Sequence, residues 1–167
     1  IAYEMIGDIQ PDRSQKLPSY VIPKDKTADQ ALILACKEGL VERGLHKSRE
    51  YIDRLKYELT VIKSKNFSEY FLTTKAIIDL FVGPGRGSGA GSLVNYVLGI
   101  TDVDPIKYGL LFERFLSPDR KDMPDIDTDI GDRDQLITLM REEFGTENIV
   151  PISNYNTFKL KSLVKDI

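Results

Sequence analysis

The sequence has few of the features that mark secreted or membrane proteins. It holds one cysteine, Cys36, so no disulfide can form within the chain, which favours a reducing, intracellular compartment. No apolar run is long enough for a transmembrane helix or for the core of a signal peptide. Together these absences predict a cytoplasmic protein without a membrane partner.

An excess of basic residues is also absent. The formal net charge is −3 and the sequence pI about 5.3, whereas a domain that grips nucleic acid unaided usually carries a strong basic excess. Much of the negative charge lies between Asp119 and Asp134, where bound metal ions would offset part of it. The single histidine, His46, has no second histidine to join it as a metal ligand, so a surface loop position is expected.

The chain contains enough apolar sequence for a folded domain. Its 167 residues suit one domain, and a hydrophobic content of 41% supports a buried core. Residues 1–24 contain three prolines and no sustained periodicity, so we expect an extended connector from an upstream domain. Because the sequence begins with Ile1 rather than Met, we expect a fragment or a processed product, with residues 25–167 forming the domain itself.

Helix signals dominate the first eighty residues. Thr27 and Gln30 form a capping-box pattern, and Gly44 marks the end of the helix that they open. Ser48 opens a second helix, in which apolar residues recur at helical spacing, and a third begins after Ser68. Further elements are predicted downstream: a short helix after Asp104, a helix from Asp132 to Gly145, a strand over residues 149–152 and a last helix from Asn154 or Asn156.

Residues 123–130 read Met-Pro-Asp-Ile-Asp-Thr-Asp-Ile and indicate a metal site. Asp125, Asp127 and Asp129 alternate with isoleucine and threonine, so on a β-strand the three carboxylates share one face. Like charges this close repel one another unless they are neutralised, and oxygen ligands suit a hard divalent cation, above all Mg²⁺. The stretch therefore predicts a metal-binding strand.

Two other structures can show this pattern. An EF-hand calcium loop also starts with alternating aspartates, but it requires Gly at its sixth position and Glu at its twelfth, where this chain has Ile130 and Leu136. An aspartate-rich turn accounts for the polarity but not for the alternation with isoleucine. The EF-hand is therefore excluded, and the turn stays open.

Residues 83–92 read Gly-Pro-Gly-Arg-Gly-Ser-Gly-Ala-Gly-Ser and lead into an apolar segment that predicts a buried helix ending at Gly99. Glycines let a ligand approach the backbone, and the N–H groups at a helix start can bind an anion. Arg86 adds a fork of donors that suits phosphate. We expect a phosphate-binding loop here.

Other glycine motifs fit this run less well. A P-loop needs Gly-Lys-Ser or Gly-Lys-Thr, and the run contains no lysine. Gly85, Gly87 and Ala90 match the spacing of a dinucleotide fingerprint, which requires a preceding strand where this sequence predicts a helix. A glycine-rich loop that only lets a helix pack closely remains the alternative.

Together these stretches resemble the C-family of bacterial and phage replicative DNA polymerases, the DNA polymerase III alpha subunits. Three ordered blocks carry the resemblance: residues 82–101 (VGPGRGSGAGSLVNYVLGIT), 102–116 (DVDPIKYGLLFERFL) and 118–130 (PDRKDMPDIDTDI). Softer similarity covers residues 26–80 and 145–167. The resemblance implies an α+β fold, with a nucleotidyltransferase palm like that of polymerase beta and a helical amino-terminal half.

The resemblance also implies a role for particular residues. Asp125 and Asp127 match the catalytic metal ligands of the family, and Asp129 completes the predicted metal set in a supporting role. Lys161 and Lys165 fall where the family has basic residues that touch phosphates. The phosphates of the incoming nucleotide would meet the glycine loop and nearby arginines: Gly85, Arg86, Gly87, Ser88, Arg114 and Arg120.

The implied chemistry is two-metal nucleotidyl transfer from a deoxynucleoside triphosphate to a primer 3′-hydroxyl. One Mg²⁺ would activate the hydroxyl, and a second would bind the triphosphate. Side chains at i and i+2 of a strand lie about 6.5–7 Å apart at Cα, so two aspartates can share an ion pair. The implied partners are deoxynucleoside triphosphates, primer–template DNA held by the full-length protein, and other replisome subunits.

Two departures from the family are expected to matter. The third catalytic aspartate of the family lies downstream of Ile167, so the chain alone should show little or no primer extension, and the connection from Leu80 to Val82 is short. Two alternatives stay open. One is a non-catalytic nucleotide-binding or interaction module derived from such a palm, and the other is an unrelated nucleotidyltransferase that needs no template.

Overall fold

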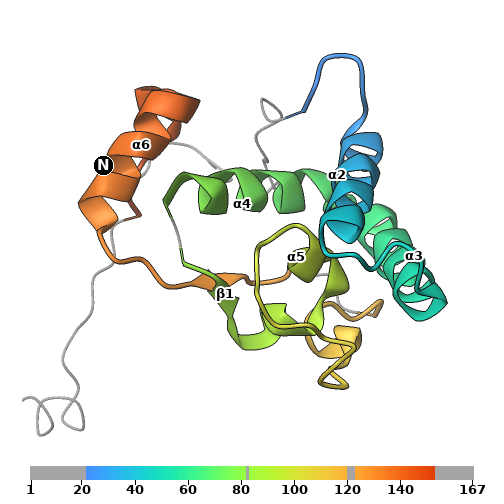
Figure 1. The fold of residues 1–167 in the computed structure, drawn as a ribbon. Helices are drawn as coiled ribbons and strands as arrows, with labels where there is room; N and C mark the ends of the chain where they lie inside the picture. Colours follow the sequence, from blue (N-terminus) through green and yellow to red (C-terminus); the bar gives the residue numbers. More distant parts are fainter. Residues whose placement is uncertain (1–21, 82, 120–122, 153–167) are drawn as a thin grey trace, which may run out of the picture. The chain divides into compact units, whose positions relative to one another are not determined.

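The computed structural model describes residues 22–81, 83–119 and 123–152, so the predicted connector lies almost wholly outside the described residues. The chain divides into two compact units, Ile1–Gly131 and Asp132–Ile167. In Figure 1 the described part of the first unit consists of helices and two very short strands. The second contains α6 (Arg133–Phe144) and the 3₁₀ helix η3 (Thr146–Asn148). No described helix has the length and apolarity to cross a membrane.

The first two helices of the described residues begin where the sequence predicts. In α2 (Ala28–Glu42) the Thr27 hydroxyl accepts a hydrogen bond from the Gln30 N–H, and the Gln30 side chain accepts one from the Thr27 N–H. Ser48 is the N-cap of α3 (Arg49–Ser64), although its side chain makes no capping hydrogen bond. These contacts confirm the capping box and both predicted starts.

One apolar core holds the helices of the first unit together. α4 (Ser68–Phe81) packs against α2, and the short helix α5 (Leu93–Val97) packs against both α2 and α3. α2 and α5 meet at Gly39, where a Cβ atom would lie only 1.9 Å from the Val97 carbonyl oxygen, so this approach requires glycine. Fully buried side chains come from every one of these elements: Leu32, Cys36, Ile62, Phe71, Leu93 and Val94.

The thiol of Cys36 is part of this core. The residue is fully buried, and burial raises the pKa of the thiol. Since the thiolate is the reactive form, we expect the thiol to be inert at pH 8 in the folded chain and to react completely in guanidinium chloride. Titration with a chromogenic disulfide reagent in both conditions checks this. Fast reaction of the folded chain would contradict the packing of α2.

The acidic stretch forms less strand than its alternation predicts. Only β2 (Asp127–Thr128) pairs in a ladder, antiparallel to β1 (Gly85–Arg86). One more backbone hydrogen bond joins the Gly83 N–H to the Asp129 carbonyl at 3.1 Å. β1 stays short because the chain turns into the 3₁₀ helix η1 (Gly87–Gly91) directly after it. In the ladder, Gly85 lies opposite Thr128 and Arg86 opposite Asp127.

Two other predicted elements differ in the structure. The segment after Asp104 forms turns and then the 3₁₀ helix η2 (Phe112–Arg114), because Gly109 with φ +62° interrupts a helical path. Asp104 still acts as a cap, accepting hydrogen bonds from two following N–H groups. Residues 149–152 form no strand with any described part of the chain, and Pro151 lacks the N–H that a ladder needs. The predicted last helix lies outside the described residues.

Candidate functional site

The three aspartates of residues 123–130 all reach solvent. Asp125, Asp127 and Asp129 are exposed, whereas Ile126 packs against the core and Thr128 is half-buried. From residue 125 to 129 the backbone thus presents carboxylates outward and the intervening residues inward, as the alternation predicts. Ile130, which the alternation places on the apolar face, is exposed instead. Carboxylates at i and i+2 on such a backbone can reach one shared ligand.

Gly87 brings the glycine loop against the second of these aspartates. A Cβ atom on Gly87 would lie 3.3 Å from Oδ2 of Asp127, and the φ of Gly87 is +68°. Glycine is favoured here both by the left-handed backbone and by the closeness of the carboxylate. The missing side chain leaves a space beside Asp127 that suits a ligand oxygen or a small ion.

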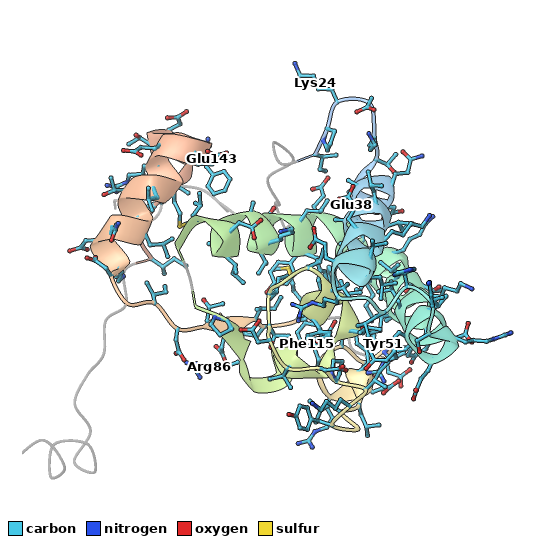
Figure 2. All side chains as sticks on the ribbon, viewed as in Figure 1. Lys24, Glu38, Tyr51, Arg86, Phe115 and Glu143 are labelled. Carbon is cyan, nitrogen blue, oxygen red and sulfur yellow. The ribbon has the colours of Figure 1, made fainter. Side chains whose placement is uncertain are left out.

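Asp129 has a different partner. Its Oδ1 accepts a hydrogen bond from Nε of Arg86 at 2.9 Å, and Figure 2 shows Arg86 at β1. An ion pair this exposed is worth at most about 1 kcal/mol, so a phosphate can replace Asp129 as the partner of Arg86. Among the described residues no three acidic, histidine or cysteine side chains gather closely enough to hold a metal ion. The predicted set of three carboxylates is therefore not preassembled.

A cleft of about 480 Å³ adjoins this space, because Gly87 belongs to both. One side of the cleft, here called the loop wall, is formed by Gly87, Ser88 and Gly91. The other side, the second wall, is formed by residues 109–111 and Arg114. A cleft of this volume with a few convergent polar groups is typical of a small-ligand site.

A larger groove of about 770 Å³ lies between α2 and α3, but its chemistry differs. Its lining includes lysines and one histidine and no carboxylate, and most of its surface is apolar, with Leu40, Ile52, Leu55 and Leu59 among the lining residues. A triphosphate with its cations needs hydrogen-bond donors and hard oxygen ligands together. The smaller cleft and the adjoining aspartates offer both, and the groove between α2 and α3 does not.

The anion that we expected at the start of α5 is part of the protein. Glu58 of α3 is fully buried and accepts hydrogen bonds from the N–H groups of Leu93 and Val94 and from the Ser92 hydroxyl, at 2.9–3.0 Å. Nε of Arg54 donates to the same carboxylate at 2.6 Å. The prediction that these N–H groups await a phosphate was therefore wrong, because Glu58 satisfies them.

The pKa of Glu58 reflects two opposed influences. Burial raises the pKa of this carboxyl, while the backbone N–H groups of Leu93 and Val94 and the guanidinium of Arg54 favour its ionised form. The sequence carried a signal for this role, since Glu58 stands three residues after Leu55 and four before Ile62, within the apolar stripe of α3. A carboxylate in such a stripe needs buried partners, so its position indicates a structural role.

Of the remaining predicted phosphate contacts, three lie in the described residues and three lie outside them. Gly85 is buried, and its N–H donates to the Ile100 carbonyl, so that N–H is not turned toward a ligand. Arg114 is exposed on the second wall, and Ser88 is exposed on the loop wall. Three predicted phosphate contacts lie outside the described residues: Arg120, Lys161 and Lys165.

Tyr70 of α4 is a core aromatic, as the helical spacing of the third helix predicts, and it also lies beside the acidic stretch. Its hydroxyl lies near the backbone of Ile126, and burial, with Asp125 and Asp127 in the neighbourhood, raises its pKa. Tyr70 and Ile126 both pack on the same core, so α4 stabilises the buried side of the acidic stretch.

Comparison with known proteins gives the family. The profile of the bacterial DNA polymerase III alpha NTPase domain matches residues 30–167. The DNA polymerase III subunit alpha of Aquifex aeolicus (strain VF5) is 47% identical over 163 residues, covering 90% of this chain and 14% of the relative. That of Bacillus subtilis (strain 168) is 45% identical over 160 residues, covering 91% of this chain and 14% of the relative. The chain, which spans about a seventh of the length of these relatives, belongs to the DNA polymerase III alpha family, as its three sequence blocks predict.

Proposed function

We propose that this chain is the palm segment of a template-directed DNA polymerase, which binds Mg²⁺ and an incoming deoxynucleoside triphosphate. The observation that best supports this is the position of Asp127, whose carboxylate lies beside Gly87 while Gly87 also lines the cleft that holds Arg114. The α+β content agrees with a palm at the level of fold class. The relatives are named DNA polymerase III subunit alpha, which supports DNA synthesis as the reaction.

The donor set at this position fits Mg²⁺. In nucleotide sites Mg²⁺ usually takes one or two carboxylates, and waters and substrate phosphates supply its other ligands. Asp125 and Asp127 offer two exposed carboxylates, and the absent side chain of Gly87 leaves room beside one of them. When bound, two ions would neutralise the triphosphate and lower the pKa of the primer hydroxyl. Asp129 would be free to support the ions once Arg86 leaves it for a phosphate.

The residues of the cleft bind and orient the triphosphate in this proposal. Ser88 on the loop wall donates its hydroxyl, and Arg114 on the second wall presents its forked guanidinium to phosphate oxygens. Arg86 exchanges Asp129 for a phosphate. Held this way, the α-phosphorus is aligned for attack, and the charge that moves onto the departing pyrophosphate is stabilised. Further phosphate contacts are proposed for Arg120, Lys161 and Lys165.

Primer–template DNA is proposed to bind mainly to other parts of a full-length polymerase. The net charge of −3 leaves this chain without the basic excess that phosphate backbones attract. Contacts with other replisome subunits and a cytoplasmic location belong to the same proposal.

Titration calorimetry of the chain with MgCl₂, in the presence of dATP, tests the metal site. Because Mg²⁺ also binds free dATP, the heats of MgCl₂ titrated into dATP alone are subtracted. We expect remaining heats for the wild type and none for the Asp125→Ala/Asp127→Ala variant, which lacks both hard ligands. Asp53→Ala is the control, because Asp53 is exposed and its carboxylate pairs with Arg49 and Lys56 of its own helix. Equal heats for the wild type and the double variant would contradict the proposed site.

A further inference from the structure

The side chain of Arg54 forms hydrogen bonds with both walls of the cleft. Nη2 of Arg54 donates to the carbonyl oxygen of Gly91 at 3.0 Å and to that of Leu110 at 3.2 Å. Gly91 belongs to the loop wall and Leu110 to the second wall. A single guanidinium nitrogen therefore connects the two walls through their main chains.

Arg54 is itself held by a buried carboxylate. Its Nε donates to Glu58, which also caps α5, the helix that follows the glycine loop. The Glu58 side chain is 0% exposed and that of Arg54 22%. Moving either group would leave a buried charge unpaired, so this pair has little freedom.

Two tyrosines of α3, one on each side of Arg54 in the sequence, bind residues of the segment 104–114 that contains the second wall. The Tyr51 hydroxyl donates to Asp104 at 2.6 Å, and the Tyr57 hydroxyl donates to Glu113 at 2.7 Å. Tyr51 and Tyr57 stand three residues before and three residues after Arg54, so all three side chains project from one side of the helix. Tyr51 is labelled in Figure 2. The bond to Asp104 raises the pKa of Tyr51 to about 12.

The walls approach each other closely at Gly91. A Cβ atom on Gly91 would lie 2.9 Å from the carbonyl oxygen of Leu111, so the two main chains are in contact there. Tyr51 and Tyr57 bind the segment that contains the second wall, whereas Arg54 binds both walls. Arg54 therefore adds a hydrogen-bonded connection between the walls to this direct contact.

We propose that Arg54 is a positioning residue, which sets the separation of the two cleft walls and thereby the affinity for a nucleoside triphosphate. The ligand in this inference rests on the proposed function. A triphosphate must meet Ser88 on one wall and Arg114 on the other at the same time, and hydrogen bonds weaken within a few tenths of an ångström of misplacement. Without Arg54 the walls separate, and the two sets of contacts are no longer made together.

Electron paramagnetic resonance between spin labels at Ser88→Cys and Leu111→Cys tests the wall separation directly. Both positions are exposed, and Cys36 stays in place because its buried thiol does not take a label. We expect one narrow distance distribution with Arg54 present and a broader or longer one in Arg54→Met. The matched control is Arg49→Met, on the same helix with a side chain 93% exposed, which should change nothing. An unchanged distribution in Arg54→Met overturns the inference.

Binding of Mg²⁺–dATP to the unlabelled chain tests the consequence. Arg54→Lys keeps the charge beside Glu58 but loses the forked donors, so we expect a folded protein with about tenfold weaker nucleotide binding. Arg54→Met should lose more affinity, and Arg49→Met none. Unchanged affinity in folded Arg54→Lys and Arg54→Met overturns the inference. If the wild type binds no nucleotide while the label distances respond to Arg54, the failure lies in the proposed function and not in the connection between the walls.

Discussion

Replacing Asp127 by Asn is expected to lower nucleotidyl transfer at least about a thousandfold in a full-length polymerase that carries this segment. The carboxylate lies beside Gly87, where the proposed metal and triphosphate meet. Removing one anionic ligand weakens a metal whose charge stabilisation is worth several kcal/mol, and about 4 kcal/mol corresponds to a thousandfold change in rate. Single-turnover primer extension at saturating Mg²⁺ measures the loss.

The same substitution should leave folding and DNA binding nearly unchanged. Asp127 is exposed, so Asn should alter the unfolding free energy by no more than about 0.5 kcal/mol. DNA affinity depends on cationic contacts to phosphates, which the substitution does not remove. Asp53→Asn provides the control for loss of an exposed carboxylate elsewhere. Primer extension by Asp127→Asn at close to the wild-type rate would refute the assignment of Asp127.

Glu58→Ala is expected to reduce the unfolding free energy of the chain by about 3–5 kcal/mol, as is usual when one partner of a buried ion pair is removed. The substitution leaves Arg54 without its carboxylate and the N–H groups of Leu93 and Val94 without an acceptor. Urea unfolding followed by circular dichroism measures the change.

Two further variants separate the network from the helix that carries it. Glu58→Gln should fall between the wild type and Ala, because the amide oxygen accepts hydrogen bonds while its NH₂ group faces other donors. Glu50→Ala, an exposed site on the same helix, should cost no more than about 0.5 kcal/mol. A loss below about 1 kcal/mol for Glu58→Ala would show that this buried network contributes little to stability.

Local sequence signals predicted the starts of α2 and α6 well, because the caps of these helices act over a few residues. The Thr27–Gln30 capping box and the N-cap at Asp132 each form the hydrogen bonds that their spacing implies. Gly99 ends the apolar segment of α5 with φ +75°, again as predicted. The outward direction of the aspartates followed equally from the alternation with Ile126 and Thr128.

Long-range partners were not visible in the sequence. The strand expected over residues 123–130 is cut to Asp127–Thr128 because its partner, Gly85–Arg86, is itself short. The helix start expected to bind phosphate is occupied by Glu58, which stands 35 residues before Leu93. Such a contact depends on how α3 packs against α5, and no local pattern encodes that packing. The sequence predicts that Arg86 binds phosphate. In the structure Arg86 pairs with Asp129, a contact that their separation in the sequence does not indicate.

We propose that Asp125 and Asp127 hold the cations of a triphosphate beside Gly87. Paramagnetic line broadening by Mn²⁺ tests this most directly. Backbone amide spectra of the chain with dATP would be recorded during addition of substoichiometric Mn²⁺. If these aspartates hold the cations, broadening will concentrate at the amides of residues 125–128 and 87–88 and will disappear in the Asp125→Ala/Asp127→Ala variant. Broadening of similar strength around other exposed carboxylates such as Asp53, unaffected by the double substitution, would contradict it.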